Sequence, residues 1–254
     1  MLAAAAIVLG LIVGSFANVC IYRLPRGESI AWPPSRCPGC KEHIRWYDNI
    51  PLLSFALLRG RCRRCGGPIA WRYPLVEALT GVLFLQSVAA FGVGLRSLHS
   101  VVLGTLLLIV FFIDLDHHII PNRITYPGTL AGLLFWVPLG WKHVAIAALT
   151  ALALGAAFIL VNVIASRLIG EEAMGMGDAK LAAMIGAFLG WPFGAVAILL
   201  GIFLGGVAGL VLLALRLKGR REQVPFGPAL AGGALTALWW GPVILHWYRN
   251  RMLG

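Results

Sequence analysis

The chain has 254 residues, of which 59% are hydrophobic and only 12% are charged, and its formal net charge is +11. About a quarter of the residues of a soluble domain are charged, so this composition excludes an ordinary soluble fold. The charge-free segments decide the class of protein, because a helix needs about 20 apolar residues to cross a bilayer. Apart from Arg23, charge-free runs cover residues 1–24, 78–95, 97–113, 124–141, 143–166, 181–215 and 223–248.

Each of these runs is expected to be helical, because lipid offers no hydrogen-bond partner to the backbone. The run 181–215 is too long for one span, and Gly190-Trp191-Pro192 lies within it. Proline removes a helix donor and clashes with the preceding turn, so we expect a break there. The sequence thus predicts an all-α polytopic membrane protein with about eight transmembrane helices, the sixth of them short. No basic residue precedes the first run, which favours a retained helix over a cleaved signal peptide.

The basic residues lie mainly on one side of this arrangement. Ten of the 21 Lys and Arg residues lie between Arg23 and Arg72, and eight helices place seven more on the same side. The positive-inside rule assigns that side to the cytoplasm of a bacterial inner (plasma) membrane. Topology and anionic lipid account for the basic loops, so we expect membrane lipid and no nucleic acid as a partner. The four remaining basic residues are Arg96, Lys142, Arg249 and Arg251.

The segment 24–75 reads as a small cytoplasmic loop domain. It carries two Cys-x-x-Cys pairs, Cys37 with Cys40 and Cys62 with Cys65. Two such pairs suit a tetrahedral Zn²⁺ site. Two disulfides or a redox motif are alternatives, but thiols in the cytoplasm stay reduced. No open coordination position is evident, so we expect a structural zinc that stabilises a loop too small to build its own core.

Two of the ten acidic residues are candidates for chemistry. Asp114 lies at the cytoplasmic end of the third predicted helix, and Asp178 closes Gly175-Met176-Gly177-Asp178 at the cytoplasmic start of the sixth, so both reach one membrane face. Asp178 would also suit a helix N-cap, and Asp114 an interfacial acid. Ionisable groups at membrane depth are costly and usually functional, however. Gly175 and Gly177 would let a peptide backbone approach Asp178 closely.

Paired carboxyl groups have a well-defined chemistry. Held about 3 Å apart they share one proton, because both cannot ionise. The charged partner takes a proton from water while the neutral one hydrogen-bonds the scissile carbonyl. Asp116 is the rival for the first acid, and we favour Asp114. This interpretation divides the chain into a first transmembrane helix (1–23), a zinc-binding domain (24–75) and a transmembrane aspartic peptidase domain (76–254).

The motif Gly175 to Asp178 resembles the GxGD signature of intramembrane aspartic proteases, which include the prepilin peptidases and the presenilin-like proteins. The four-cysteine loop and Ile113-Asp114 with Pro121 resemble bacterial type IV prepilin leader peptidases. One departure is Asn122, where that family often has aspartate, but this position is not the catalytic acid. Further similar segments are Ser15-Phe16-Ala17-Asn18-Val19, Arg23-Leu24-Pro25 and Tyr73-Pro74-Leu75-Val76-Glu77.

The resemblance implies cleavage of type IV prepilins and pseudopilins after a glycine at the cytoplasmic membrane face. The host system stays open among a type IV pilus, type II secretion and a competence pilus. Asp114 and Asp178 then take the catalytic positions. Many such enzymes also N-methylate the new N-terminus with S-adenosylmethionine. Glu28, Glu42 and Glu77 are acidic residues near the loop that could contact this cofactor. We interpret Glu28 and Glu42 as solvated or interfacial charges, and assign no residue to methyl transfer. The alternatives are a GxGD protease for other membrane proteins and a non-enzymatic, zinc-stabilised membrane scaffold.

Overall fold

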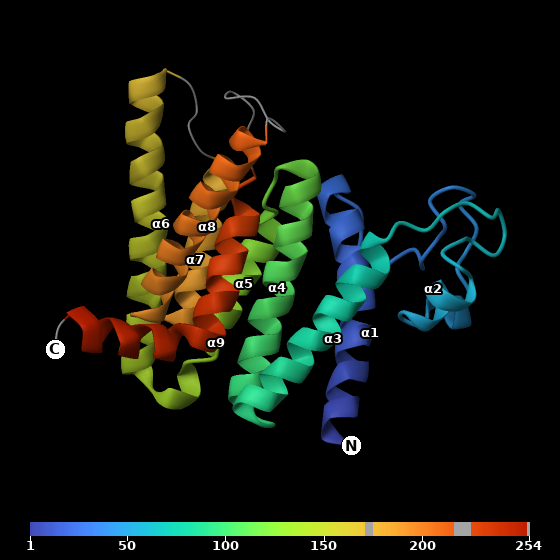
Figure 1. The fold of residues 1–254 in the computed structure, drawn as a ribbon, viewed down its shortest axis with the longest axis horizontal. Coiled ribbons are helices and arrows are strands. Elements are labelled where there is room, and N and C mark those ends of the chain that lie inside the picture. Colours follow the sequence, from blue (N-terminus) through green and yellow to red (C-terminus); the bar gives the residue numbers. More distant parts are fainter. Residues whose placement is uncertain (171–174, 216–224, 253–254) are drawn as a thin grey trace. The chain divides into compact units, whose positions relative to one another are not determined.

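The computed structural model describes residues 1–170, 175–215 and 225–252, and this part of the chain is all helical, with no strand (Figure 1). The all-α prediction is therefore confirmed. Short 3-10 helices lie at Leu24–Arg26 (η1), Trp46–Asn49 (η2) and Val137–Leu139 (η3). The α-helices are α1 Leu2–Arg23, α2 Leu53–Leu57, α3 Arg72–Phe91, α4 Leu95–His117, α5 Asn122–Leu134, α6 Trp141–Ile169, α7 Met176–Leu189, α8 Phe193–Ala214 and α9 Gly227–Met252.

Each of the eight predicted membrane helices corresponds to a helix of the structure, but not all of these helices are long enough to cross a membrane. Among the described residues, six helices are long and apolar enough to cross a membrane: α1, α3, α4, α6, α8 and α9. Helix α5 has 13 residues and α7 has 14. The sequence predicts that α7 is short, but it does not predict the short α5. Helix α5 ends at Leu134, and the chain then turns at Pro138 and at Gly140, which has a positive φ. These helices make the chain a multi-pass membrane protein.

The predicted break in the long apolar run is confirmed. Helix α7 ends at Leu189 and α8 begins at Phe193, so residues 190–192 separate them. Gly190 has a φ of 61°, which glycine adopts without strain and which ends the helix. The basic residues between 216 and 221, which the charge count assigned to the cytoplasmic side, lie outside the described residues.

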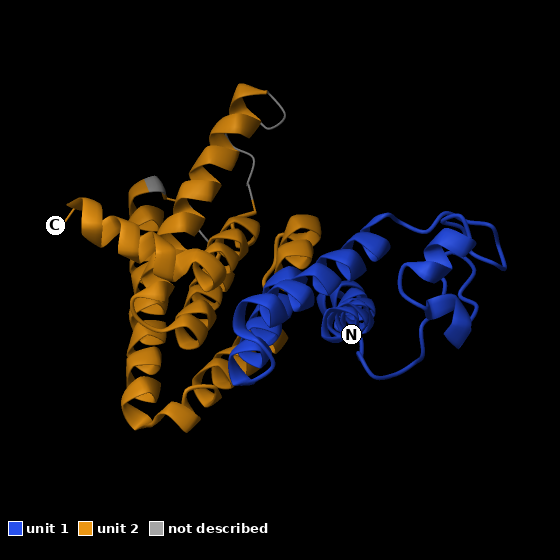
Figure 2. Cartoon of the chain, turned by 60° about the horizontal axis from the view of Figure 1, so that its bottom comes forward, with its two compact units in different colours: residues 1–109 blue, residues 110–254 orange. Residues whose placement is uncertain are grey.

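The chain forms two compact units, residues 1–109 and 110–254, and the boundary falls within α4 (Figure 2). In unit 1, α1 packs closely on α3 through two glycines spaced four apart. A Cβ at Gly10 would lie 2.7 Å from the carbonyl oxygen of Thr80, and one at Gly14 2.7 Å from Cα of Glu77. Small residues at this spacing let membrane helices approach closely. The two glycines of Gly10-Leu11-Ile12-Val13-Gly14 form a pattern from which this contact could have been predicted, but it is not among the patterns used above to predict the fold.

In unit 2 the short helix α7 forms the core. Every residue from Leu181 to Leu189 except Ala183 is buried. Helices α5 and α6 reach it through glycines: a Cβ at Gly132 would lie 2.8 Å from the Phe188 ring. Outward-facing Leu152 on α6 and Phe203 on α8 are exposed, as suits a surface against lipid. Helix α7 is thus surrounded by protein, which explains why it need not match the thickness of a bilayer.

Candidate active site and metal centre

Asp114 and Asp178 are both buried, and both lie in unit 2. Asp114 is 5% exposed near the end of α4, and Asp178 is 9% exposed in the first turn of α7. Asp116, two residues after Asp114, is exposed. Burial therefore favours Asp114 over Asp116 as the first acid of the pair. The catalytic roles of Asp114 and Asp178 stay predictions.

The N-terminus of α9 contacts Asp114 directly. The backbone N–H of Gly227 donates a hydrogen bond of 2.8 Å to Oδ2 of Asp114. A Cβ at position 227 would lie 2.7 Å from the same oxygen, so this approach requires glycine. A helix N-terminus also carries partial positive charge, which favours an ionised carboxylate. Sequence reasoning missed Gly227, because its side chain carries no chemistry and it lies 113 residues from Asp114 along the chain.

Asp178 does not cap its helix. The N-cap residue of α7 is Gly175, and no side chain caps this end. Among the described residues, no group donates a hydrogen bond to the Asp178 carboxyl, unlike that of Asp114. The capping interpretation is therefore wrong, and the buried carboxyl group is left available for other partners.

The start of α7 contacts the segment that follows Asp114. A Cβ at Gly177 would lie 2.9 Å from Cβ of Ile120, so glycine allows this approach. The Nζ of Lys180 donates a hydrogen bond of 2.9 Å to Oδ1 of Asn122, at the first residue of α5. These two contacts tie the segments that carry Asp114 and Asp178 to each other. The Lys180 contact is a second feature that the sequence motifs did not reveal.

The four loop cysteines come together as the sequence predicted. Their sulfur atoms all lie within 4.8 Å of one another, which is an arrangement able to hold a metal ion. The sulfurs of Cys37 and Cys65, from different pairs, are 3.9 Å apart. A disulfide needs a sulfur separation of about 2.05 Å, and all four thiols are free. The disulfide alternative is therefore wrong for this structure.

The two Cys-x-x-Cys segments have the same backbone structure. The N–H of Cys37 donates to the carbonyl of Glu42, and the N–H of Lys41 donates to the carbonyl of Cys37. The second segment repeats both bonds, from Cys62 to Gly67 and from Gly66 to Cys62. Such turns point backbone N–H groups at a sulfur. The N–H groups of Cys65 and Arg64 lower the pKa of the Cys62 thiol to about 7, which favours the thiolate that binds metal.

Two family models match the chain and together span most of it. Residues 8–91 match the bacterial peptidase A24 N-terminal domain, and residues 101–210 match the type IV leader peptidase family. The first match contains all four cysteines, and the second contains both buried aspartates. No solved structure matches the chain.

Curated relatives agree with these matches over nearly the full length. A prepilin leader peptidase/N-methyltransferase of Myxococcus xanthus is 43% identical over 91% of this chain and 70% of its own length. A protein of the same name from Aeromonas hydrophila is 37% identical over 96% of this chain and 92% of its own length. Another from Legionella pneumophila is 36% identical over 94% of this chain and 91% of its own length. The chain is therefore an enzyme that belongs to the type IV leader peptidase family, whose members compared above are named prepilin leader peptidase/N-methyltransferase.

Proposed function

We propose that the protein is an aspartic endopeptidase that removes the leader peptides of type IV prepilins and pseudopilins, cutting after a glycine at the cytoplasmic face of a bacterial inner membrane. The observation that carries this proposal is the burial of Asp114 and Asp178 in one unit, where the segments that carry them contact each other through Gly177 and Ile120 and through Lys180 and Asn122. Paired carboxyl groups in such a place activate water without a covalent intermediate. The names of the relatives supply the substrate class.

The surroundings of the two aspartates support a different role for each. The N–H of Gly227 stabilises negative charge on Asp114, since hydrogen bonds to a carboxylate favour its ionised form. Asp178 receives no such bond from any described residue, so the shared proton belongs on Asp178. Asp114 is then the general base, and Asp178 is the group that hydrogen-bonds the scissile carbonyl.

The reaction follows from this assignment. Asp114 takes a proton from water as the water oxygen bonds to the carbonyl carbon, and Asp178 gives its proton to the carbonyl oxygen. The resulting gem-diol then returns one hydroxyl proton to Asp178. Asp114 passes its proton to the leaving nitrogen as the C–N bond breaks. Both aspartates end the cycle in their starting states, and the products are a free carboxyl group and a new amino terminus.

The four cysteines are proposed to hold a structural Zn²⁺ ion. Four thiolates at a Zn–S distance of about 2.3 Å lie about 3.8 Å apart in a tetrahedron, close to the 3.9 Å between Cys37 and Cys65. With four cysteine ligands from the chain, such an ion would have no open position for a substrate. Zinc would instead join the two Cys-x-x-Cys turns and stabilise the loop between α1 and α3.

We further propose that the enzyme N-methylates the amino terminus that cleavage exposes, and the name N-methyltransferase that its relatives carry supports this activity. Bound S-adenosylmethionine would supply a methyl group to the amine nitrogen. The amine loses a proton, and the electrons of the broken S–CH₃ bond stay on sulfur.

Purified protein incubated with a prepilin tests the proposal, with the mass of the product N-terminus as the readout. We expect a product shortened by its leader and heavier by one methyl group when S-adenosylmethionine is present. Asp114→Asn and Asp178→Asn are expected to lower the cleavage rate by a factor of at least about 100. Asp116→Asn is the matched control and should cleave at a rate near that of the parent. Cleavage by Asp114→Asn or Asp178→Asn at the parent rate would falsify the dyad.

A further inference from the structure

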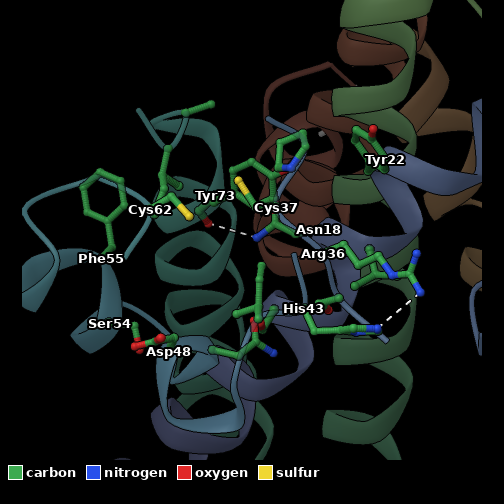
Figure 3. A pocket seen from close by; sticks show the side chains of 18 of the residues that line it. Asn18, Tyr22, Arg36, Cys37, His43, Asp48, Ser54, Phe55, Cys62 and Tyr73 are labelled. Atoms are coloured by element: carbon green, nitrogen blue, oxygen red, sulfur yellow. Dashed lines mark hydrogen bonds between the residues drawn. The ribbon is translucent and has the colours of Figure 1, made fainter. Parts of the chain in front are cut away.

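The short helix α2 has two different sides. Ser54 and Phe55 line the cavity that the four-cysteine loop encloses with α1 and α3 (Figure 3). Leu53 and Leu57, one helical turn apart, do not line that cavity, and they are 51% and 73% exposed. Ala56 beside them is exposed as well. Helix α2 therefore carries an apolar face that no described part of the chain covers, and such a face is unfavourable in water.

Contacts with α3 fix the depth of this apolar face. The N–H of Leu52, the N-cap residue of α2, donates a hydrogen bond of 2.9 Å to Oε2 of Glu77. Glu77 lies five residues beyond the first residue of α3, which is about 7.5 Å along the helix axis. The Phe55 ring packs against the ring of Trp71, the N-cap residue of α3, with centroids 4.9 Å apart. Helix α2 thus lies beside the first turns of α3, and Figure 1 shows it level with α1 and α3 and not beyond the ends that the loop connects.

The first turns of α3 lie at the edge of the hydrocarbon core. Helix α3 has 20 residues, so at 1.5 Å per residue it is about 30 Å long, which is the thickness of that core. The span has no residues to spare, and its beginning has to lie near the headgroups. The end of α1 is held at the same place, because Nδ2 of Asn18 donates a hydrogen bond of 3.0 Å to the carbonyl of Tyr73 (Figure 3). The apolar face of α2 is therefore at the depth of headgroups and upper acyl chains, where a water-soluble partner does not reach.

Tryptophan and arginine side chains around α2 suit the same depth. Trp46 and Trp71 are 81% and 78% exposed, and tryptophan is enriched where a bilayer meets water. Arg59 and Arg61 follow α2, are exposed, and form no ion pair with a described residue. Residues 23–72 contain ten basic and three acidic residues, and two of the acids already pair with other arginines. The loop thus carries a surplus of positive charge that complements anionic headgroups.

We propose that α2 lies in the plane of the membrane surface and binds anionic lipid, with Leu53 and Leu57 among the upper acyl chains and Arg59 and Arg61 on lipid phosphates. Amphipathic segments bind membranes through this combination of buried apolar area and electrostatic attraction. The four-cysteine loop is then held against the bilayer by the end of α1, by the start of α3 and by α2 between them. This attachment of the loop does not depend on the proposed cleavage or methylation.

Photo-crosslinking in a defined bilayer tests the proposal. Full-length protein with p-benzoylphenylalanine in place of Leu57 is inserted into nanodiscs of phosphatidylcholine and phosphatidylglycerol, illuminated, and analysed by peptide mass spectrometry. We expect lipid adducts on the peptide that contains position 57, with phosphatidylglycerol enriched over its share of the bilayer. The same group in place of Leu58, which lines the cavity, is the matched control and should attach to protein.

Charge variants test the role of the two arginines. Arg59→Gln combined with Arg61→Gln, in the protein that carries the crosslinker at position 57, should lower the enrichment of phosphatidylglycerol by about fivefold or more. Arg96→Gln removes a charge at the start of α4, after the far end of α3, and should leave the enrichment unchanged.

Three results would overturn the proposal. The first is attachment of the group at position 57 only to protein, including a second copy of the chain. The second is an equal yield of lipid adducts at positions 57 and 58. The third is unchanged phosphatidylglycerol enrichment in the double arginine variant.

Discussion

The backbone N–H of Gly227 donates a hydrogen bond of 2.8 Å to Oδ2 of Asp114, so the first turn of α9 supports one of the two buried carboxyl groups. No described residue gives Asp178 the same support. The pair is therefore asymmetric before any substrate arrives, and this asymmetry supports the proposal that Asp114 acts as the base. The relationship also makes Gly227 a positioning residue that can be tested.

Gly227→Ala is expected to lower the cleavage rate by about 100-fold. The new Cβ would lie 2.7 Å from Oδ2 of Asp114, so the carboxylate or α9 must move, and small displacements of catalytic groups cost this much. The rate of prepilin cleavage at saturating substrate is the measurement. Gly232→Ala, on the same helix, is the control, since its Cβ would meet only the flexible end of Leu204 at 3.3 Å. Equal rates for both variants would contradict the positioning role.

Zinc is expected at about one ion per chain, and Cys62→Ser should reduce it to near zero. A structural metal supplies folding free energy, so the same variant and treatment with a chelator should both make segment 36–68 sensitive to protease. Metal content by mass spectrometry and limited proteolysis are the two measurements. Cys20→Ser changes a buried cysteine of α1 outside the cluster and should keep its zinc. Full zinc content in Cys62→Ser would rule out the four-cysteine site.

The hydrogen bond from Lys180 to Asn122 is expected to position the dyad. Asn122→Leu removes the acceptor and should slow cleavage by about three- to tenfold, through displacement of α7 against α5. Asn122→Asp keeps the acceptor and adds a charge opposite Lys180, so its rate should stay within about twofold of the parent. Cleavage assays of the two variants side by side decide the matter. Equal cleavage rates for Asn122→Leu and Asn122→Asp would show that this hydrogen bond does not position the two aspartates.

The close packing of α1 on α3 is expected to be sensitive to size at Gly10. Gly10→Val places a Cβ 2.7 Å from the carbonyl oxygen of Thr80, so the helices must separate. Overpacking of this kind costs about 1 to 3 kcal/mol, and the apparent melting temperature in detergent should fall accordingly. Gly94→Ala is the control, because its Cβ would meet nothing within 4 Å. An unchanged melting temperature for Gly10→Val would show that this contact does not limit stability.

Much of the fold follows from the spacing of charges and from proline. Charge-free runs located the eight helices, and Gly190-Trp191-Pro192 located the break between α7 and α8. The early end of α5 was missed, because an apolar run does not reveal whether Pro138 and Gly140 lie inside a helix or after it. The length of α7 makes sense only once its burial by other helices is known.

Some residues of the candidate site could likewise be predicted from the sequence, and others could be found only from the fold. Candidate ligand and catalytic side chains, such as Cys37 and Asp178, can be recognised in the sequence from their residue types and spacing. Gly227 acts through its backbone, and Lys180 through a partner 58 positions away, so neither could be found without the fold. Glu77 stands out in the sequence as an acidic residue near the loop, but its burial and its bond to Leu52 depend on how the loop returns to α3.

Arg23 holds the start of the loop through main-chain oxygens alone, those of Ser29, Pro33 and Pro34. The bonds of Arg23 therefore depend on the backbone conformation of this segment and not on which side chains it carries. Over evolutionary time, such an anchor constrains position 23 strongly while leaving the side chains around it open to drift. Relatives that differ widely between positions 29 and 34 should still carry arginine at the end of their first helix, which an alignment of the family can check.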